Sequence, residues 1–187
     1  MREKRILAAL GDSNTFGYDP CSPFGGRYPA AVRWTGRLEG WQVHNLGMNG
    51  LCIPAGVMLE DVCAALERLR PDVVTVMLGS NDLLQGAAPA RAAARMTDLL
   101  RVLTGRWSTL LIAPPPMAPG QWVRSQALMD ASRDLAGAYR TAARQTGAAF
   151  ADAGDWGVEL AFDGVHFTER GHGTFAGRLS EMLTEYL

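Results

Sequence analysis

The chain has 187 residues, of which 48% are hydrophobic and 20% are charged, and its formal net charge is −1. This length is typical of one domain with a single core, so we expect residues 1–187 to form one domain. The near-neutral charge argues against a nucleic-acid or membrane-surface partner, and no apolar run is long enough to cross a membrane.

The cysteine content favours a reducing compartment. The chain has an odd number of cysteines, and none of them belongs to a CxxC pair: Cys21, Cys52 and Cys63. The apolar run near the N-terminus is too short for a signal peptide. We therefore expect a cytoplasmic protein.

Short apolar runs alternate with segments whose apolar residues recur at helical spacing. The predicted strands are Ile6–Leu10, Trp41–Asn45, Val73–Leu78, Thr109–Ala113 and Ala148–Ala151. The predicted helices have apolar faces made of Met58, Val62, Ala65, Leu66 and Leu69; of Ala92, Met96, Leu99, Leu100 and Leu103; of Leu128, Leu135 and Tyr139; and of Phe175, Leu179, Met182 and Leu183. This alternation predicts a parallel sheet with helices on both faces, a three-layer α/β/α architecture.

Polar clusters follow four of the predicted strands. "GDSN" (11–14) comes after the first strand, "GMNG" (47–50) after the second, "GSND" (79–82) after the third and "DGVHF" (163–167) after the fifth. The loop after the fourth strand contributes mostly proline. Because ligands bind beyond the carboxyl ends of the strands in such sheets, we expect these four clusters to share one site.

Ser13 is a nucleophile, a helix cap or a turn residue, and a nucleophilic serine needs a base. His44 falls inside or at the end of the second strand, and His172 is expected to be solvated or capping at the start of the last helix. His166 follows Asp163 by three residues, so one loop could carry a base and the carboxylate that orients it. The alternative is an Asp-Gly turn followed by an unrelated histidine.

Acyl transfer also needs hydrogen-bond donors for an oxyanion. The Gly50 N–H, the Asn81 side-chain amide and the Ser13 N–H are candidates, although both surrounding motifs also occur as simple turns. Asp12 neighbours Ser13, and we expect it to bond backbone amides rather than to act as the base.

Together these residues resemble the SGNH (GDSL) hydrolase family. The resemblance runs through "GDSNTFG" (11–17), "NLGMNG" (45–50), "MLGSNDL" (77–83) and "DGVHFT" (163–168), in family order. It implies that Ser13 is the nucleophile of a triad with Asp163 and His166. It also implies an oxyanion hole formed by Ser13, Gly50 and Asn81. The fold that it implies is a five-stranded flavodoxin-like sheet in the order 2-1-3-4-5.

The sequence is most similar to the arylesterase and acyltransferase branch, through "RYPAAVRWTGRL" (27–38), "APPPMAP" (113–119) and "DGVHFTE" (163–169). Two features depart from that branch. The residue before Gly50 is Asn49, where many members have serine, and the stretch between Gly50 and Leu69 is shorter than in typical members. The resemblance therefore does not predict an oligomeric state, although a homo-oligomer is compatible with it.

We expect a serine esterase that hydrolyses small short-acyl esters through an acyl-enzyme, with acyl transfer to alcohols as a second outcome. Little chain remains for a lid, and the apolar side chains available for an acyl wall are Phe16, Met48, Ile53 and Met117, some of which could belong to the core. The alternatives are a non-catalytic flavodoxin-like module that binds small molecules and a degenerate, non-catalytic family member. Neither a cofactor nor a metal is expected, because no zinc-type spacing or phosphate loop is present.

Overall fold

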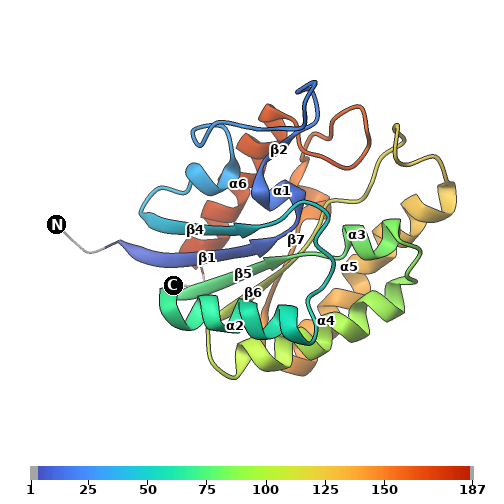
Figure 1. Cartoon of the computed structure of the whole chain (residues 1–187). Coiled ribbons are helices and arrows are strands. Elements are labelled where there is room, and N and C mark those ends of the chain that lie inside the picture. Colours follow the sequence, from blue (N-terminus) through green and yellow to red (C-terminus); the bar gives the residue numbers. More distant parts are fainter. Residues whose placement is uncertain (1–3, 186–187) are drawn as a thin grey trace.

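The structure is a computed structural model that describes residues 4–185, so residues 1–3 and 186–187 of the predicted domain lie outside it. Its centre is a sheet of five parallel strands (Figure 1). They are hydrogen-bonded in the order β4-β1-β5-β6-β7, which is 2-1-3-4-5 along the chain. The strand order implied by the family resemblance is thus confirmed. The strands are β1 (Arg5–Gly11), β4 (Trp41–Gly47), β5 (Val73–Met77), β6 (Thr109–Ala113) and β7 (Ala149–Asp152).

Helices cover both faces of this sheet (Figure 1). One face packs against α2, α4 and α5, and the other packs against α6 and the short helix η1. This arrangement confirms the three-layer α/β/α architecture. The bounds are α2 (Val57–Leu69), α4 (Pro89–Thr104), α5 (Gln126–Thr146), α6 (Glu169–Glu185) and η1 (Trp34–Gly36).

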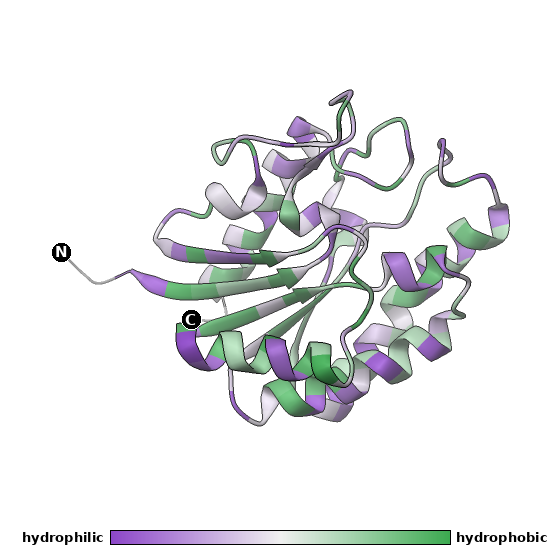
Figure 2. Cartoon of the chain, in the orientation of Figure 1, coloured by the Kyte–Doolittle hydropathy of each residue, from purple (hydrophilic) through white to green (hydrophobic). Residues whose placement is uncertain are grey.

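Each face of the sheet has its own hydrophobic core. In β1, Ala8 and Leu10 contribute to the core beneath α4 and α5, whereas Leu7 and Ala9 contribute to the core beneath α6. The residues of β5 and β6 are all buried, because helices cover both of their faces. This explains why their sequences are almost continuously apolar, as the hydrophobic strands in Figure 2 show.

Helix α2 is covered less completely than its apolar face predicts. Leu66 is fully buried, but Val62 and Leu69 are half-buried and Met58 is 40% exposed. The reason is the position of α2, which packs on β1 and borders a hollow beside the edge strand β4. An edge strand has a neighbour on one side only, so the helix beside it has less protein to contact.

Several short elements near the carboxyl ends of the strands were not predicted. None has more than five residues, so none can show a helical or strand period. Most follow the strands that precede the polar clusters, and they shape the site described below. They are α1 (Ser13–Phe16), the antiparallel pair β2 (Tyr18–Asp19) and β3 (Gly26–Arg27), α3 (Ser80–Leu84) and η2 (Ala153–Trp156).

Candidate active site

The turn that carries Ser13 is fixed against the ends of two strands. β1 ends at Gly11, which lies opposite Gly47 at the end of β4, two residues beyond the predicted end of that strand. A Cβ atom on Gly47 would lie 2.2 Å from the backbone nitrogen of Phe16, so glycine is what lets α1 rest directly on the sheet. Ser13 is the first residue of α1 and is 6% exposed.

Ser13, His166 and Asp163 form a continuous hydrogen-bonded chain. The Ser13 Oγ lies 2.9 Å from His166 Nε2, across 153 positions of sequence. The His166 Nδ1 lies 2.7 Å from Asp163 Oδ2. Both His166 and Asp163 are 2% exposed. The serine, histidine and aspartate that the sequence singled out are therefore brought together.

The Asp163 carboxylate organises its own loop. Its Oδ1 accepts hydrogen bonds from the backbone amides of Val165 and His166, both at 2.9 Å. Burial by itself raises the pKa of the Asp163 carboxyl, but the hydrogen bonds from His166 and Val165 outweigh burial, and the net pKa is lowered. Asp163 is thus ionised at neutral pH. A carboxylate at Nδ1 favours the tautomer in which Nε2 is free to accept a proton from Ser13.

Asp12 bonds a backbone amide, as the sequence indicated, and in doing so caps α1. Its Oδ1 accepts a hydrogen bond from the Asn14 amide at 3.0 Å. Burial raises the pKa of the Asp12 carboxyl to about 6, although the hydrogen bond from Asn14 and the charge of His166 act in the opposite direction.

Asn14, which was not among the predicted site residues, joins the Ser13 turn to the His166 loop. Its side-chain Nδ2 donates to the Val165 carbonyl at 3.0 Å, and its Oδ1 accepts from the Phe167 amide at 2.9 Å. The side chain is 4% exposed. A polar residue next to a candidate nucleophile was the available signal, but its partners lie about 150 positions away, so no local pattern reveals them.

The three candidate oxyanion donors come from three separate segments: Ser13 begins α1, Gly50 lies in the loop after β4, and Asn81 lies in α3. Gly50 has a φ of 73°, a conformation that favours glycine. Neither the Ser13 amide nor the Gly50 amide donates to another residue in the described part of the chain. The Asn81 amide nitrogen donates to the Leu51 carbonyl at 3.1 Å, which leaves it a second N–H.

Helix α3 also holds the loop that follows Gly50. The buried Asp82 carboxylate accepts from the Ile53 amide at 3.0 Å and from Arg95 Nη1 at 2.9 Å. Together with the bond from Asn81 to Leu51, this contact ties the "GMNG" loop to the "GSND" helix. Two of the predicted polar clusters are thus linked to each other.

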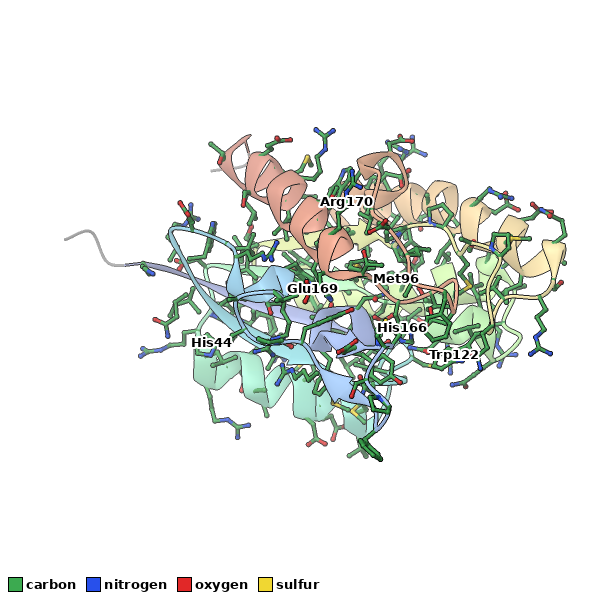
Figure 3. All side chains as sticks on the ribbon, turned by 90° about the horizontal axis from the view of Figure 1, so that it is seen from above. His44, Met96, Trp122, His166, Glu169 and Arg170 are labelled. Carbon is green, nitrogen blue, oxygen red and sulfur yellow. The ribbon has the colours of Figure 1, made fainter. Side chains whose placement is uncertain are left out.

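The other two histidines lie outside the hydrogen-bonded chain. His44 sits in the edge strand β4, with its Nε2 3.1 Å from the Gln42 amide nitrogen, and Figure 3 shows it well away from His166. The expectation that His172 is solvated or capping is wrong, because its side chain is fully buried. His172 lies on the side of α6 that faces the core, and its ring packs against the rings of Tyr28 and Phe167.

The burial of His172 changes its protonation. Its Nδ1 accepts a hydrogen bond from the Trp34 amide at 3.4 Å, and its Nε2 has no partner in the described residues. Burial, together with the nearby charges of Arg37 and Arg33, lowers the pKa of His172 to about 4. The imidazole is therefore neutral at physiological pH and acts as a core residue.

The apolar side chains considered for an acyl wall divide into two groups. Ile53 and Met117 belong to the hydrophobic core, each 4% exposed. Met48 is 46% exposed, and Phe16 lies under the Arg27 guanidinium, whose carbon is 4.2 Å from the ring centroid. Only Met48 and Phe16 thus remain available as a wall. A hollow of about 460 Å³ lies between β4 and α2, and none of Ser13, Asp163 and His166 lines it.

Neither a metal-binding cluster nor a membrane-spanning helix is found in residues 4–185. Within residues 4–185, no three side chains of His, Cys, Asp or Glu gather closely enough to hold a metal ion. No helix in the same range is both long enough and apolar enough to span a lipid bilayer.

A doubly wound parallel sheet with a serine, a histidine and an aspartate in contact at its carboxyl edge has the architecture of a serine hydrolase. The model of the GDSL-like lipase/acylhydrolase family matches residues 9–173 of the sequence. The chain belongs to this family and is a carboxylic ester hydrolase.

Several solved structures share the fold. Est24, a carbohydrate acetylesterase from Sinorhizobium meliloti, is 25% identical with a TM-score of 0.86, over 98% of this chain and 100% of that one. The aryl esterase of M. smegmatis is 24% identical with a TM-score of 0.84, and the match again covers 98% of this chain and 100% of that one. A member of the lipolytic G-D-S-L family from Veillonella parvula is 18% identical with a TM-score of 0.76, over 96% and 98%. No curated protein sequence matches the chain.

Proposed function

We propose that this chain is a serine esterase that hydrolyses small, short-acyl carboxylic esters through an acyl-enzyme. The observation that carries the proposal is the chain of contacts from Ser13 Oγ through the His166 imidazole to the Asp163 carboxylate. Burial of all three groups strengthens these contacts, because the local dielectric is low. Membership of a hydrolase family favours this reading over that of a non-catalytic binding module.

In the first half of the reaction, Ser13 Oγ attacks the ester carbonyl while His166 Nε2 takes the hydroxyl proton. The ionised Asp163 stabilises the imidazolium that forms. When the tetrahedral intermediate collapses, the bond to the alcohol oxygen breaks, and that oxygen takes the proton from Nε2. The alcohol leaves, and the acyl group remains on Ser13.

In the second half, water takes the place of the alcohol. His166 Nε2 accepts a proton from the water as its oxygen attacks the acyl carbonyl, and it then returns that proton to Ser13 Oγ. A carboxylic acid leaves, and the free enzyme is restored. If an alcohol attacks instead of water, the same steps transfer the acyl group to a new ester.

The developing oxyanion is stabilised by the Ser13 amide, the Gly50 amide and the Asn81 side chain. Two observations support this assignment. The first two amides have no acceptor among the described residues, and the Asn81 nitrogen has a second hydrogen beyond the one given to Leu51. Donors that are already in position stabilise the transition state without reorganising.

The test is hydrolysis of p-nitrophenyl acetate by purified protein. Ser13→Ala and His166→Ala should each lower kcat by about three decades or more, because each removes a step of the chemistry. His44→Ala is the matched control and should retain the wild-type rate. A serine-reactive phosphonate should label Ser13 stoichiometrically, as intact-protein mass measures. Full activity in folded Ser13→Ala would exclude this mechanism.

The cellular location stays a prediction. All three cysteines are free thiols, which supports a cytoplasmic location, because thiols stay reduced there: Cys21, Cys52 and Cys63. Non-reducing peptide mapping of the protein isolated from its native cells would test this, since a disulfide there would argue against it.

A further inference from the structure

Two aromatic side chains flank the imidazole of His166. The Trp122 ring lies edge-on to it, with centroids 4.9 Å apart and planes at 81°. The Tyr18 ring lies 4.6 Å away at 49°. Figure 3 shows Trp122 and His166 at the same end of the molecule. His166 itself is 2% exposed, but Trp122 is 49% exposed, so an indole surface next to the buried imidazole is open to solvent.

The backbone of the loop holds Trp122 in this position. The loop between β6 and α5 pairs with the segment that carries the catalytic aspartate: the Gln121 amide donates to the Phe162 carbonyl, and the Trp122 amide donates to the Asp163 carbonyl, both at 3.1 Å. A Cβ atom on Gly120 would lie 2.3 Å from the Asp163 carbonyl carbon, so the two segments are in direct contact. With its backbone held in this way and its ring edge-on against His166, the indole has a defined position beside the imidazole.

The direction of proton transfer indicates which part of an ester meets this surface. In the proposed reaction, His166 Nε2 gives its proton to the oxygen of the leaving alcohol, so this oxygen lies within hydrogen-bond reach of Nε2. The carbonyl oxygen turns instead toward the amides of Ser13, Gly50 and Asn81. The side chains that flank the imidazole thus border the alcohol and not the acyl group.

We infer that Trp122, with Tyr18 beside it, is a binding site for the alcohol part of the substrate and selects esters of ring-bearing alcohols. A fixed, half-exposed indole offers a flat apolar face, and a planar arene or the apolar face of a pyranose can stack on such a face. A small linear alcohol covers little of it. Trp122 is then a specificity-determining residue. This inference rests on the proposed function, because it requires His166 to protonate the leaving alcohol.

The experiment keeps the acyl group constant and changes the alcohol. Wild type, Trp122→Leu and Trp122→Ala are assayed with ethyl acetate, benzyl acetate and 6-O-acetyl methyl glucoside. We expect each variant to lower the ratio of kcat/KM for a ring ester to that for ethyl acetate by about tenfold, or about 1.4 kcal/mol. The change should arise mainly in KM. The benzyl and glucoside arms show whether the favoured ring is an arene or a sugar.

Phe162→Ala is the matched control. Phe162 is 60% exposed and lies on the paired segment, but its ring makes no contact with His166, so the ratio should stay at the wild-type value. An equal loss on ring esters and ethyl acetate would mean that Trp122 only supports His166, and no loss on either would mean that substrate does not reach it. Both outcomes overturn the inference but leave the proposed function standing. A wild-type protein inactive on every acetate would overturn both.

Discussion

Asn14→Ala removes a side chain that joins the Ser13 turn to the His166 loop at two points. The change deletes the hydrogen bond to the Val165 carbonyl at 3.0 Å and the one from the Phe167 amide at 2.9 Å. Because the site is 4% exposed, water cannot readily replace the lost partners. A backbone carbonyl and a backbone amide are then left buried without partners.

The magnitude follows from these two groups. Each buried group that loses its partner costs about 1–3 kcal/mol. Relaxation of the loop recovers part of this, so we expect the free energy of unfolding to fall by about 2–4 kcal/mol, which lowers Tm by roughly 4–16 °C for a chain of this size. The distance between Ser13 Oγ and His166 Nε2 is no longer fixed, and kcat should fall by about 10- to 100-fold with little change in KM.

Denaturant unfolding followed by circular dichroism measures the first effect, and steady-state hydrolysis of p-nitrophenyl acetate measures the second. Gln42→Ala is the matched control, because it deletes an amide that is exposed and bonds only at the surface. That variant should change stability by less than about 0.5 kcal/mol. If Asn14→Ala unfolds with the wild-type midpoint and retains the wild-type kcat, the two bonds do not hold the site together.

The remaining predictions concern the oxyanion donors, the packing of α1, a buried histidine and the acyl group. Asn81→Ala should lower kcat on p-nitrophenyl acetate by about 10²–10³-fold with little change in KM, and an effect on KM alone would make the amide a substrate-binding group. Gly47→Ala should lower the free energy of unfolding by about 1–3 kcal/mol, as measured in denaturant, because the added methyl group would displace α1. Gly137→Ala is the control: its methyl group would enter open space beside α5, so this variant should not be destabilised. The folded-state pKa of His172, about 4, lies below the unfolded value of 6.5, so its contribution to stability is complete above pH 6.5 and is lost as the pH falls to 4. Between pH 7 and pH 4, the free energy of unfolding of the wild type should therefore fall by about 3 kcal/mol more than that of His172→Gln. If the difference between the two free energies does not change with pH, the imidazole is not buried in its neutral form. Asp12, whose folded-state pKa is raised to about 6, has the opposite pH dependence, but it affects both proteins equally. In a p-nitrophenyl ester series kcat/KM should be highest from acetate to butyrate, because longer chains find little apolar wall and each exposed methylene forgoes about 0.8 kcal/mol; a steady rise to decanoate would contradict this.

Much of the sheet and of the site could be predicted from the sequence, because both depend on local patterns. Strands covered on two faces are apolar throughout, and β5 and β6 are recognisable for that reason. The rule that ligands bind beyond the carboxyl ends of parallel strands then placed Ser13 and His166 at the same edge, although 153 positions separate them. The spacing of Asp163 and His166 suffices for their contact because one short loop carries both.

What the sequence did not predict depends on contacts between distant loops. The two partners of Asn14 lie across the molecule, and the position of Trp122 beside His166 follows from backbone pairing that no side chain specifies. The proline-rich loop that precedes Trp122 gave no chemical signal of its own. The burial of His172 was missed because its environment is supplied by Trp34 and Tyr28, on a segment far away in the sequence.

The way the loop before α5 is attached affects how the enzyme can diversify. Main-chain hydrogen bonds and the close contact at Gly120 anchor this loop, and Arg124 Nε donates to the Gln121 carbonyl, whereas the side chains of Gln121 and Trp122 are exposed and are not needed for these bonds. Mutations of Gln121 and Trp122 therefore change the rim of the site without removing the main-chain bonds that hold the loop. A library randomised there, with Gly120 kept, should consist mostly of folded proteins. In such a scaffold, evolution or a protein engineer can alter substrate preference while the loop that carries Asp163 and His166 stays in place.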